Sequence, residues 1–406
     1  MLFQIPTKEK KLWLQSNKGD SFGNLFSTFN MDFDIVLGKV RVSPNLRINT
    51  DSGDDADLGV PLAFLRANIG TDRYWALCGT RLFRTTATSP TGAFSEAATD
   101  DGGTTAPPTS MTTVSSDMVV FNGKLYVSLP TDIAELDGTV WDNDWWTTIV
   151  AGTALTTGIP HPLCISKKTN SFMVGDGNVL HITDKNESPK NSRIILSLEF
   201  EIVWIRSNNS GTWIGARHKI GGEGKVFFWD ESAENYNKGG HGIMSRLPLS
   251  CVIKNEIPYV INTDGQLLKF TGSGFEEVAV LPIFKQINQR WYNGSDNDLP
   301  VVHRNGMAII ENKISILLQS YVSGVTDNFL SNFPSGVWTF DETQGLRHKF
   351  SLSQYDGTEI DYGIPSMTNN VGALISTDGE QGLFLAGGII TTNISTTLTA
   401  IFFRNL

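Results

Sequence analysis

Carboxylates and indole rings are the side chains whose types and spacing in this sequence are suited to chemistry. A short acidic stretch holds four aspartates: Asp51, Asp54, Asp55 and Asp57. In glycosidases, two carboxylates about 5 to 10 Å apart act as general acid and as nucleophile or base. Oxygen ligands at short spacing also suit calcium, but the stretch matches neither an EF-hand nor an RTX repeat. Because Asp side chains hydrogen-bond turn backbones, turn formation is the favoured interpretation, and no catalytic or metal-binding residue is predicted.

The most aromatic segment of the chain is Trp-Asp-Asn-Asp-Trp-Trp at residues 141–146. Flat apolar rings can stack on a sugar, so the candidate glycan-stacking residues are Trp141, Trp145 and Trp146. Asp142 and Asp144 lie beside these rings. For them, as for the other aspartates, turn formation is favoured over a catalytic role. An aromatic cluster more often packs inside a protein or against a partner, so glycan binding is an alternative rather than the leading hypothesis.

Other signatures of chemistry are weak. None of HExxH, CxxC and GxxxxGK[ST] occurs, and the nearest match, at residues 221–225, continues into Val226, so it predicts a glycine-rich hairpin before a strand. The six histidines show no paired spacing on one strand face. The three cysteines, Cys78, Cys164 and Cys251, have apolar neighbours and are expected to be buried strand residues. We therefore predict a protein that is not an enzyme and that binds no cofactor.

The charge and hydropathy of the chain exclude several classes of partner. Its 406 residues contain 32 Lys+Arg against 42 Asp+Glu, a formal net charge of -10, which argues against binding a nucleic-acid backbone. No stretch approaches the roughly 18 apolar residues of a membrane-spanning helix. Charges in the opening run MLFQIPTKEKKLWLQ interrupt the apolar segment that a signal peptide needs, so we expect a protein assembled in a cytoplasm.

Turn dipeptides between strand-like runs are the strongest structural signal. Asn-Gly and Asp-Gly favour the type I′ turn of tight hairpins, in which both central residues have positive φ. Four such pairs lie inside strand-like segments: Asn122-Gly123, Asp176-Gly177, Asp264-Gly265 and Asp378-Gly379. Helical periodicity is nearly absent, so the chain is predicted to be all-β.

Strand-rich units recur along the chain. They begin near Leu62, Met118, Leu163, Ile202, Leu249, Met307 and Val371. A spacing of mostly about 40 to 60 residues is typical of propeller blades. The sequence therefore predicts a β-propeller of about seven four-stranded blades. Six blades, eight blades or a pair of β-sandwiches are open alternatives, because the spacing between the units is irregular.

The predicted domains are an extended N-terminal arm at residues 1–32 and a single β-propeller domain at residues 33–406. Two segments of the propeller domain are expected to be inserted surface loops: 85–116, which is rich in Thr, Ser and Ala, and 320–335. We expect the strand-like stretch at 33–42 to pair with the C-terminal strand at 396–402. That pairing would complete the last blade and remove an open sheet edge.

One segment resembles a structural motif of sialidase-type propellers. Ser207-Asn208-Asn209-Ser210-Gly211-Thr212-Trp213 is similar to the Asp-box, a turn that locks the hairpin between the third and fourth strands of a blade. Asn209 replaces the Asp, and the spacing is one residue short. Because an Asp-box is remote from the active site, the segment predicts hairpin geometry and no sialidase activity.

Several blade-sized runs share their pattern with a known group of proteins. These runs are VRVSPNLRINTDSGDDADLGVPLAF, the unit Trp-Ala-x-Cys-Gly-Thr-x-Leu-Phe, SDMVVFNGKLYVS, TWIGARHKIGGEGKVFFWDE and IPYVINTDGQLLKFTGSGFEEVAVLP. Over residues 35–285 the chain resembles β-propeller proteins encoded among the virion genes of tailed bacteriophages. The resemblance implies a structural component of the tail or tail-to-head region, assembled in symmetric copies.

The leading hypothesis is therefore a non-enzymatic virion protein, assembled in the host cytoplasm. Its expected partners are copies of itself and other virion proteins, reached through loops and the arm, with no nucleic acid and no membrane span. A glycan-binding propeller for host attachment is the second hypothesis, with Trp213 and Trp229 as further stacking candidates. A polysaccharide-degrading glycosidase is the third.

Overall fold

The structure of the chain is a computed structural model. It describes residues 61–78, 81–86, 95–97, 108, 117–150, 152–189, 194–220, 223–231, 247–281, 306–310, 312–318, 336–343 and 345–351, with the backbone of short strands at 3–4, 31–34, 39–42, 47–49, 373–377, 380–386 and 400–402. These residues form antiparallel sheets of three or four strands, and one short helix, α2 (Trp145–Ile149), lies among them. The prediction of an all-β chain is confirmed for this part of the sequence.

In the sheets of the main body, each strand pairs with its neighbour along the chain, as a meander does. The first three sheets contain β5 (Pro61–Ile69), β6 (Asp72–Cys78), β7 (Arg81–Thr85) and β8 (Ser95–Glu96); β9 (Met118–Phe121), β10 (Lys124–Ser128), β11 (Ile133–Asp137) and β12 (Val140–Asp142); and β13 (Leu163–Ile165), β14 (Phe172–Asp176), β15 (Val179–Ile182) and β16 (Ile194–Ile195). The next three contain β17 (Phe200–Asn208), β18 (Gly211–His218) and β19 (Gly224–Trp229); β20 (Pro248–Lys254), β21 (Ile257–Asn262), β22 (Gln266–Phe270) and β23 (Phe275–Val280); and β24 (Met307–Ile310), β25 (Lys313–Leu318), β26 (Gly336–Asp341) and β27 (Gly345–Ser351).

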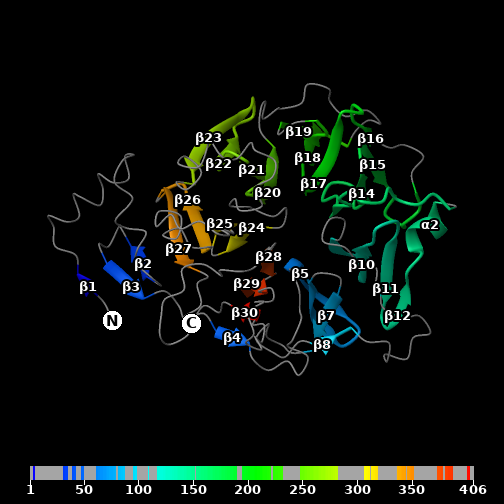
Figure 1. Cartoon of the computed structure of the whole chain (residues 1–406), viewed down its shortest axis with the longest axis horizontal. Helices are drawn as coiled ribbons and strands as arrows, with labels where there is room; N and C mark the ends of the chain where they lie inside the picture. Colours follow the sequence, from blue (N-terminus) through cyan, green and yellow to red (C-terminus); the bar gives the residue numbers. More distant parts are fainter. Residues whose placement is uncertain are drawn as a thin grey trace.

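The last sheet joins strands from opposite ends of the sequence. It contains β28 (Ala373–Thr377), β29 (Glu380–Ala386), β30 (Ala400–Phe402) and β4 (Arg47–Asn49). The first strands of successive sheets contact one another in the order β5, β9, β13, β17, β20, β24 and β28, and β28 also contacts β5. In Figure 1 the sheets accordingly follow one another around the molecule in sequence order.

The predicted unit starts agree with these first strands. Met118, Leu163 and Met307 are the first residues of β9, β13 and β24, and the other four predicted starts lie within two residues of β5, β17, β20 and β28. Alternation of apolar side chains and turn residues therefore marks strand onset well, because both are local properties of the chain.

The strand expected to pair with the C-terminal strand was misassigned. The prediction named residues 33–42, but β30 pairs with β4, through Ile401 opposite Ile48. Residues 33–42 contribute instead to a separate sheet in which β3 (Lys39–Val42) lies between β1 (Phe3–Gln4) and β2 (Met31–Asp34). A β2–β3 hairpin closes only a short loop, which costs little chain entropy, so local pairing prevails there.

The two predicted insertions have different outcomes. The segment at 85–116 is not wholly loop, since β8 lies inside it and pairs with β7 through Phe83 opposite Glu96. Ala97, directly after β8, is buried. The segment at 320–335 lies outside the described residues, as does most of the arm at 1–32.

Turn geometry supports one of the four predicted dipeptides. Asn122 and Gly123 have φ of 50° and 80°, as a type I′ turn requires. Gly265 also has a positive φ, of 70°, but its amide donates a hydrogen bond to the Asn262 carbonyl at 2.9 Å, so Asp264-Gly265 belongs to a longer loop between β21 and β22. At Asp176-Gly177 the register differs: Asp176 pairs with Val179, so the two-residue loop consists of Gly177 and the residue after it. Asp378-Gly379 lies outside the described residues, although β28 and β29 pair on either side of it.

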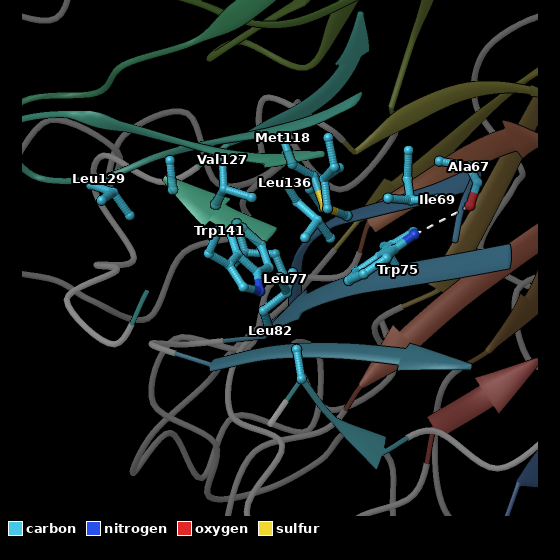
Figure 2. Close-up of a cluster of buried hydrophobic side chains, with 14 residues drawn as sticks. Ala67, Ile69, Trp75, Leu77, Leu82, Met118, Val127, Leu129, Leu136 and Trp141 are labelled. Carbon is cyan, nitrogen blue, oxygen red and sulfur yellow. Dashed lines mark hydrogen bonds between the residues drawn. The ribbon is translucent and has the colours of Figure 1, made fainter. Parts of the chain in front are cut away.

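Apolar clusters fill the spaces between neighbouring sheets. One cluster draws side chains from the β5–β8 sheet, including Trp75 and Leu77, and from the β9–β12 sheet, including Leu125, Leu136 and Trp141 (Figure 2). The indole of Trp75 is fully buried, and its Nε1 donates a hydrogen bond to the Ala67 carbonyl at 3.2 Å. The hydrogen bond satisfies the indole's polar group, so the ring adds apolar burial without an uncompensated donor.

Glutamates with left-handed backbone conformations bridge neighbouring sheets. Glu187, Glu231 and Glu256 have φ of 67°, 61° and 66°. Glu231, which follows β19, accepts hydrogen bonds from the hydroxyls of Ser166 at 2.5 Å and Thr169 at 2.8 Å, beside β13 and β14. Glu256, between β20 and β21, accepts a hydrogen bond from the Asn209 amide at 2.7 Å. Positive φ is unfavourable for a residue with a Cβ, and these contacts between sheets offset its cost.

Candidate functional site

The three tryptophans proposed to stack on a glycan are core residues. Trp141, Trp145 and Trp146 are 5%, 5% and 2% exposed. Trp141 packs in the cluster between the first two sheets, while Trp145 and Trp146 pack with Tyr126 and Phe172 between the second and third. Buried rings present no open face to a sugar, so in this structure their role is packing, which is the role that the sequence favoured.

Trp213 and Trp229, the further stacking candidates, are also buried. The indole of Trp213 lies between Phe228 and Phe270, with ring centroids 4.6 and 4.7 Å away. The aromatic residues that suggested a sugar platform therefore hold sheets together.

The carboxylates near α2 accept hydrogen bonds from backbone amides. Asp132 is buried and its Oδ1 accepts hydrogen bonds from the amides of Ile133 at 2.7 Å and Trp146 at 2.9 Å, while its Oδ2 accepts from the Thr147 hydroxyl at 2.6 Å. Asp132 lies in the connection between β10 and β11, so it caps the start of α2 from outside the helix. Asp142 Oδ1 accepts from the amide of Asp144 at 3.0 Å, a local turn. The acidic stretch from Asp51 to Asp57 lies outside the described residues.

The segment similar to an Asp-box does lock a hairpin. Asn208 Oδ1 accepts hydrogen bonds from the amides of Ser210 at 3.1 Å and Gly211 at 3.0 Å. The hairpin joins β17 and β18, which are the first two strands of their sheet rather than the third and fourth. The geometry was predicted correctly, but its place in the sheet was not.

Two histidines and an aspartate form a polar cluster among the described residues, and no sequence pattern predicted it. Asp176, at the end of β14, lies with Oδ1 3.6 Å from His161 Nε2 and Oδ2 3.7 Å from His181 Nε2. His161 is fully buried, and its Nδ1 lies 3.0 Å from the Leu129 carbonyl oxygen. The amide of Thr156 donates a hydrogen bond to Asp176 Oδ1 at 3.0 Å.

The charge of Asp176 is stabilised by these neighbours. Burial opposes ionisation, but the interactions with His161, His181 and the Thr156 amide outweigh it and hold the pKa of Asp176 below its usual range. An ionised carboxylate 3.6 and 3.7 Å from two imidazole nitrogens can orient both rings, which is the chemistry available to this cluster. The ring of His181 meets the Trp146 ring edge-on at 5.4 Å.

Hairpin register would have revealed half of this cluster. Val174 is directly opposite His181 across β14 and β15, so Asp176 is a diagonal neighbour of His181 on the same face. His161 comes from the connection before β13, and no local pattern relates it to the hairpin.

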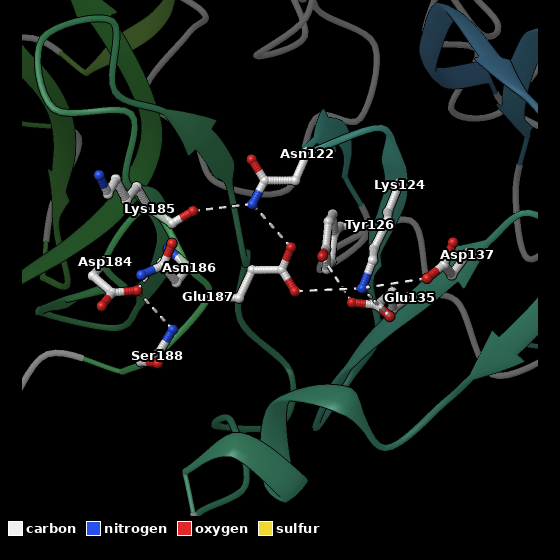
Figure 3. A network of polar contacts seen from close by, with 10 residues as sticks. All are labelled: Asn122, Lys124, Tyr126, Glu135, Asp137, Asp184, Lys185, Asn186, Glu187 and Ser188. Carbon is white, nitrogen blue, oxygen red and sulfur yellow. Dashed lines mark hydrogen bonds and ion pairs between the residues drawn. The ribbon is translucent and has the colours of Figure 1, made fainter.

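A second polar network links the β9–β12 sheet to the turn that follows β15 (Figure 3). Lys124 Nζ lies 3.0 Å from Glu135 Oε1, 3.5 Å from Asp137 Oδ2 and 3.5 Å from Glu187 Oε2. Burial disfavours the ammonium, but the hydrogen bond and charge of Glu135 outweigh it and raise the pKa of Lys124. The hydroxyl of Tyr126 donates to Glu135 Oε2 at 2.7 Å, inside the sheet.

Burial makes the thiols of Cys164 and Cys251 unreactive. Cys251 is buried and Cys164 is partly buried, and both are free. Burial raises the pKa of each thiol to about 12, which leaves almost no thiolate near neutral pH. Cys78 lies on β6, as expected for a strand residue.

Within the described ranges, no group of three or more His, Cys, Asp or Glu could hold a metal ion. No helix in the same ranges has the length and apolar character needed to cross a membrane.

No protein-family model and no curated protein matches the chain. Among solved structures, a chain described as the extracellular domain of a one component system from B. thetaiotaomicron is 13% identical, with a TM-score of 0.47 over 86% of this chain and 39% of that one. A chain of the Mitotic Checkpoint Complex is 14% identical, with a TM-score of 0.46 over 90% and 96%. Raptor from Chaetomium thermophilum is 10% identical, with a TM-score of 0.48 over 87% and 29%. Similarity this low carries no argument about function.

Proposed function

We propose that the chain is a seven-bladed β-propeller and a structural, non-enzymatic component of a tailed-phage virion that acts by protein–protein assembly. The proposed blades are the sheets that begin with β5, β9, β13, β17, β20, β24 and β28. The contacts of these first strands in cyclic order, with β28 beside β5, support this arrangement. The sequence resemblance to virion propellers supports the role.

The observation that carries the proposal is the pairing of β30 with β4. It ties a strand near the start of the chain to one near its end, so the last sheet cannot separate without breaking backbone hydrogen bonds. A ring fastened in this way is a rigid body, and rigid bodies pack reproducibly into symmetric assemblies. In our proposal the loops and the segment before β2 make the contacts with neighbouring copies.

The two alternatives remain predictions. The rings first suggested for glycan stacking are buried, so a glycan-binding role would have to use other residues. A glycosidase would need two carboxylates facing one cleft about 5 to 10 Å apart.

The proposal is tested by measuring the mass of the full chain by light scattering and imaging the assembly by electron microscopy. We expect a closed ring of several copies, and we expect a variant lacking residues 1–30, which retains β2, to lose it. An unchanged melting temperature would show that this variant is folded. A full chain that stays monomeric, and that mass spectrometry does not detect in purified phage particles, would overturn the proposal.

A further inference from the structure

The turn between β9 and β10 contains a pair of residues with intrinsic covalent reactivity. Asn122 and Gly123 form its two-residue loop, and Asn122 is exposed. In an Asn-Gly pair the backbone nitrogen of glycine can attack the side-chain carbonyl carbon of asparagine, because glycine has no Cβ to obstruct the approach. A Cβ added at Gly123 would have no atom within 4 Å, so the surroundings do not shield this residue.

Contacts with the next sheet hold the reactive carboxamide. Asn122 Nδ2 donates hydrogen bonds to the Lys185 carbonyl at 3.1 Å and to Glu187 Oε1 at 3.1 Å, which uses both of its hydrogens. Asp184 Oδ1 fixes the accepting turn, since it accepts hydrogen bonds from the amides of Asn186 at 2.7 Å and Ser188 at 2.9 Å. Figure 3 shows the Asn122 side chain directed at this turn. A carboxamide held on both hydrogens is not free to rotate toward Gly123.

We propose that Asn122 is a deamidation site guarded by this junction between sheets. When these hydrogen bonds open locally, the Gly123 nitrogen gives up its proton and bonds to the Asn122 side-chain carbon. The side-chain nitrogen takes up a proton and leaves as ammonia, giving a succinimide. Water then opens the ring to aspartate or isoaspartate. The reaction consumes one water, releases one ammonia and needs no oxidant or cofactor. Its rate follows the population of the open junction.

The product cannot restore the junction. A carboxylate at position 122 has no donor for the Lys185 carbonyl or for Glu187, and its negative charge faces the Glu187 carboxylate. Lys124, 3.5 Å from Glu187 Oε2, offsets part of this repulsion but is shared with Glu135 and Asp137. Deamidation therefore acts as a one-way loss of the hydrogen bonds that link Asn122 to the turn at 184–188.

The first experiment measures deamidation at Asn122 by peptide mapping of the folded full chain at mildly alkaline pH. We expect Glu187→Ala to raise the rate about fivefold, because the carboxamide loses a hydrogen bond to a charged acceptor. Glu187→Gln keeps an acceptor oxygen and is the matched control, with a rate within about twofold of the natural chain. Asn293-Gly294 and Asn305-Gly306, in the same digest, report any general change in reactivity.

Equal Asn122 rates in the natural chain and in Glu187→Ala, with both proteins folded by circular dichroism, would overturn the proposal. So would a Glu187→Gln rate as high as that of Glu187→Ala. A second comparison does not depend on the Glu187 variants. Asn122→Asp copies the product, whereas Asn122→Ser lacks the carboxamide without adding charge. We expect Asn122→Asp to melt at a lower temperature than Asn122→Ser, and equal melting temperatures would contradict the release mechanism.

Discussion

Two neighbouring junctions between sheets are built differently. The junction of the β5–β8 and β9–β12 sheets is filled by a large apolar cluster around Trp75 and Trp141. The junction of the β9–β12 and β13–β16 sheets has an apolar cluster around Tyr126 and Phe172, with a charged network along its border. Apolar contact is non-directional and scales with buried area, whereas the charged network depends on the geometry of single atoms.

The comparison shows that two properties of a contact between sheets come from different interactions. These properties are its free energy and the relative position of the sheets. Burial of large side chains supplies most of the free energy that holds adjacent sheets together. Hydrogen bonds such as those from Asn122 to the turn at 184–188 fix how the sheets meet, at a smaller net energy. Four predictions test this division, from the largest expected effect to the smallest.

The largest effect should come from the apolar junction. Trp75→Ala is expected to lower the free energy of unfolding by about 3 to 5 kcal/mol, because it leaves a cavity at a fully buried site. Urea denaturation followed by tryptophan fluorescence and circular dichroism would measure the change. Val140→Ala is the matched control, since Val140 lies in the β9–β12 sheet but is 53% exposed, and it should change stability by less than about 0.5 kcal/mol. Similar losses for the two variants would contradict the assignment of strength to the buried cluster.

A turn outside both junctions provides the next test. Gly265 has φ of 70°, so Gly265→Val is expected to cost about 2 kcal/mol through backbone strain. Gly265→Asn, which tolerates positive φ, should cost less than half as much. The melting temperatures of the two variants, measured by calorimetry, separate backbone strain from the loss of glycine itself. An unchanged melting temperature in Gly265→Val would show that the turn assignment is wrong.

Tyr126 allows both kinds of contact to be compared within one side chain. Its ring packs against Trp145 with centroids 4.7 Å apart, and its hydroxyl donates to Glu135. Tyr126→Phe removes only the hydrogen bond and should cost about 1 kcal/mol, whereas Tyr126→Ala also removes the ring and should cost about 3 to 5 kcal/mol. If chemical denaturation gave equal losses for the two, the hydroxyl rather than the ring would dominate this junction.

The smallest effect should appear only at alkaline pH. Tyr259 on β21 donates a hydrogen bond to Glu342 Oε1 at 2.6 Å, beside β26, and burial together with Glu342 raises the pKa of Tyr259 to about 12. The unfolded value is about 10. A raised folded pKa stabilises the fold below pH 10, and this contribution declines as the pH rises from about 10 to 12. Thermal melting over this range should fall less steeply for Tyr259→Phe, and parallel curves would falsify the contribution of this phenol.

The fold was more predictable than the polar clusters for reasons visible in particular residues. Met118, Leu163 and Met307 were identified as strand starts because alternation and turn signals lie within a few neighbouring residues. Asn122-Gly123 was predicted as a type I′ turn for the same reason. The partner of β30 was misidentified, since a short strand has little local signal and its pairing joins residues near opposite ends of the chain.

The sequence alone determined the all-β architecture, the onset of each strand-rich unit and the Asn122-Gly123 turn, because side-chain alternation and backbone preferences act over a few residues. Only the tertiary structure decided that Trp145 and Trp146 are buried, that His161 meets Asp176, and that Glu187 reaches Lys124 and Asn122. How the sheets pack against each other decides which side chains are exposed and which side chains meet. The composition of a segment does not contain that information, because the atoms that bury or bind its side chains come from other parts of the chain.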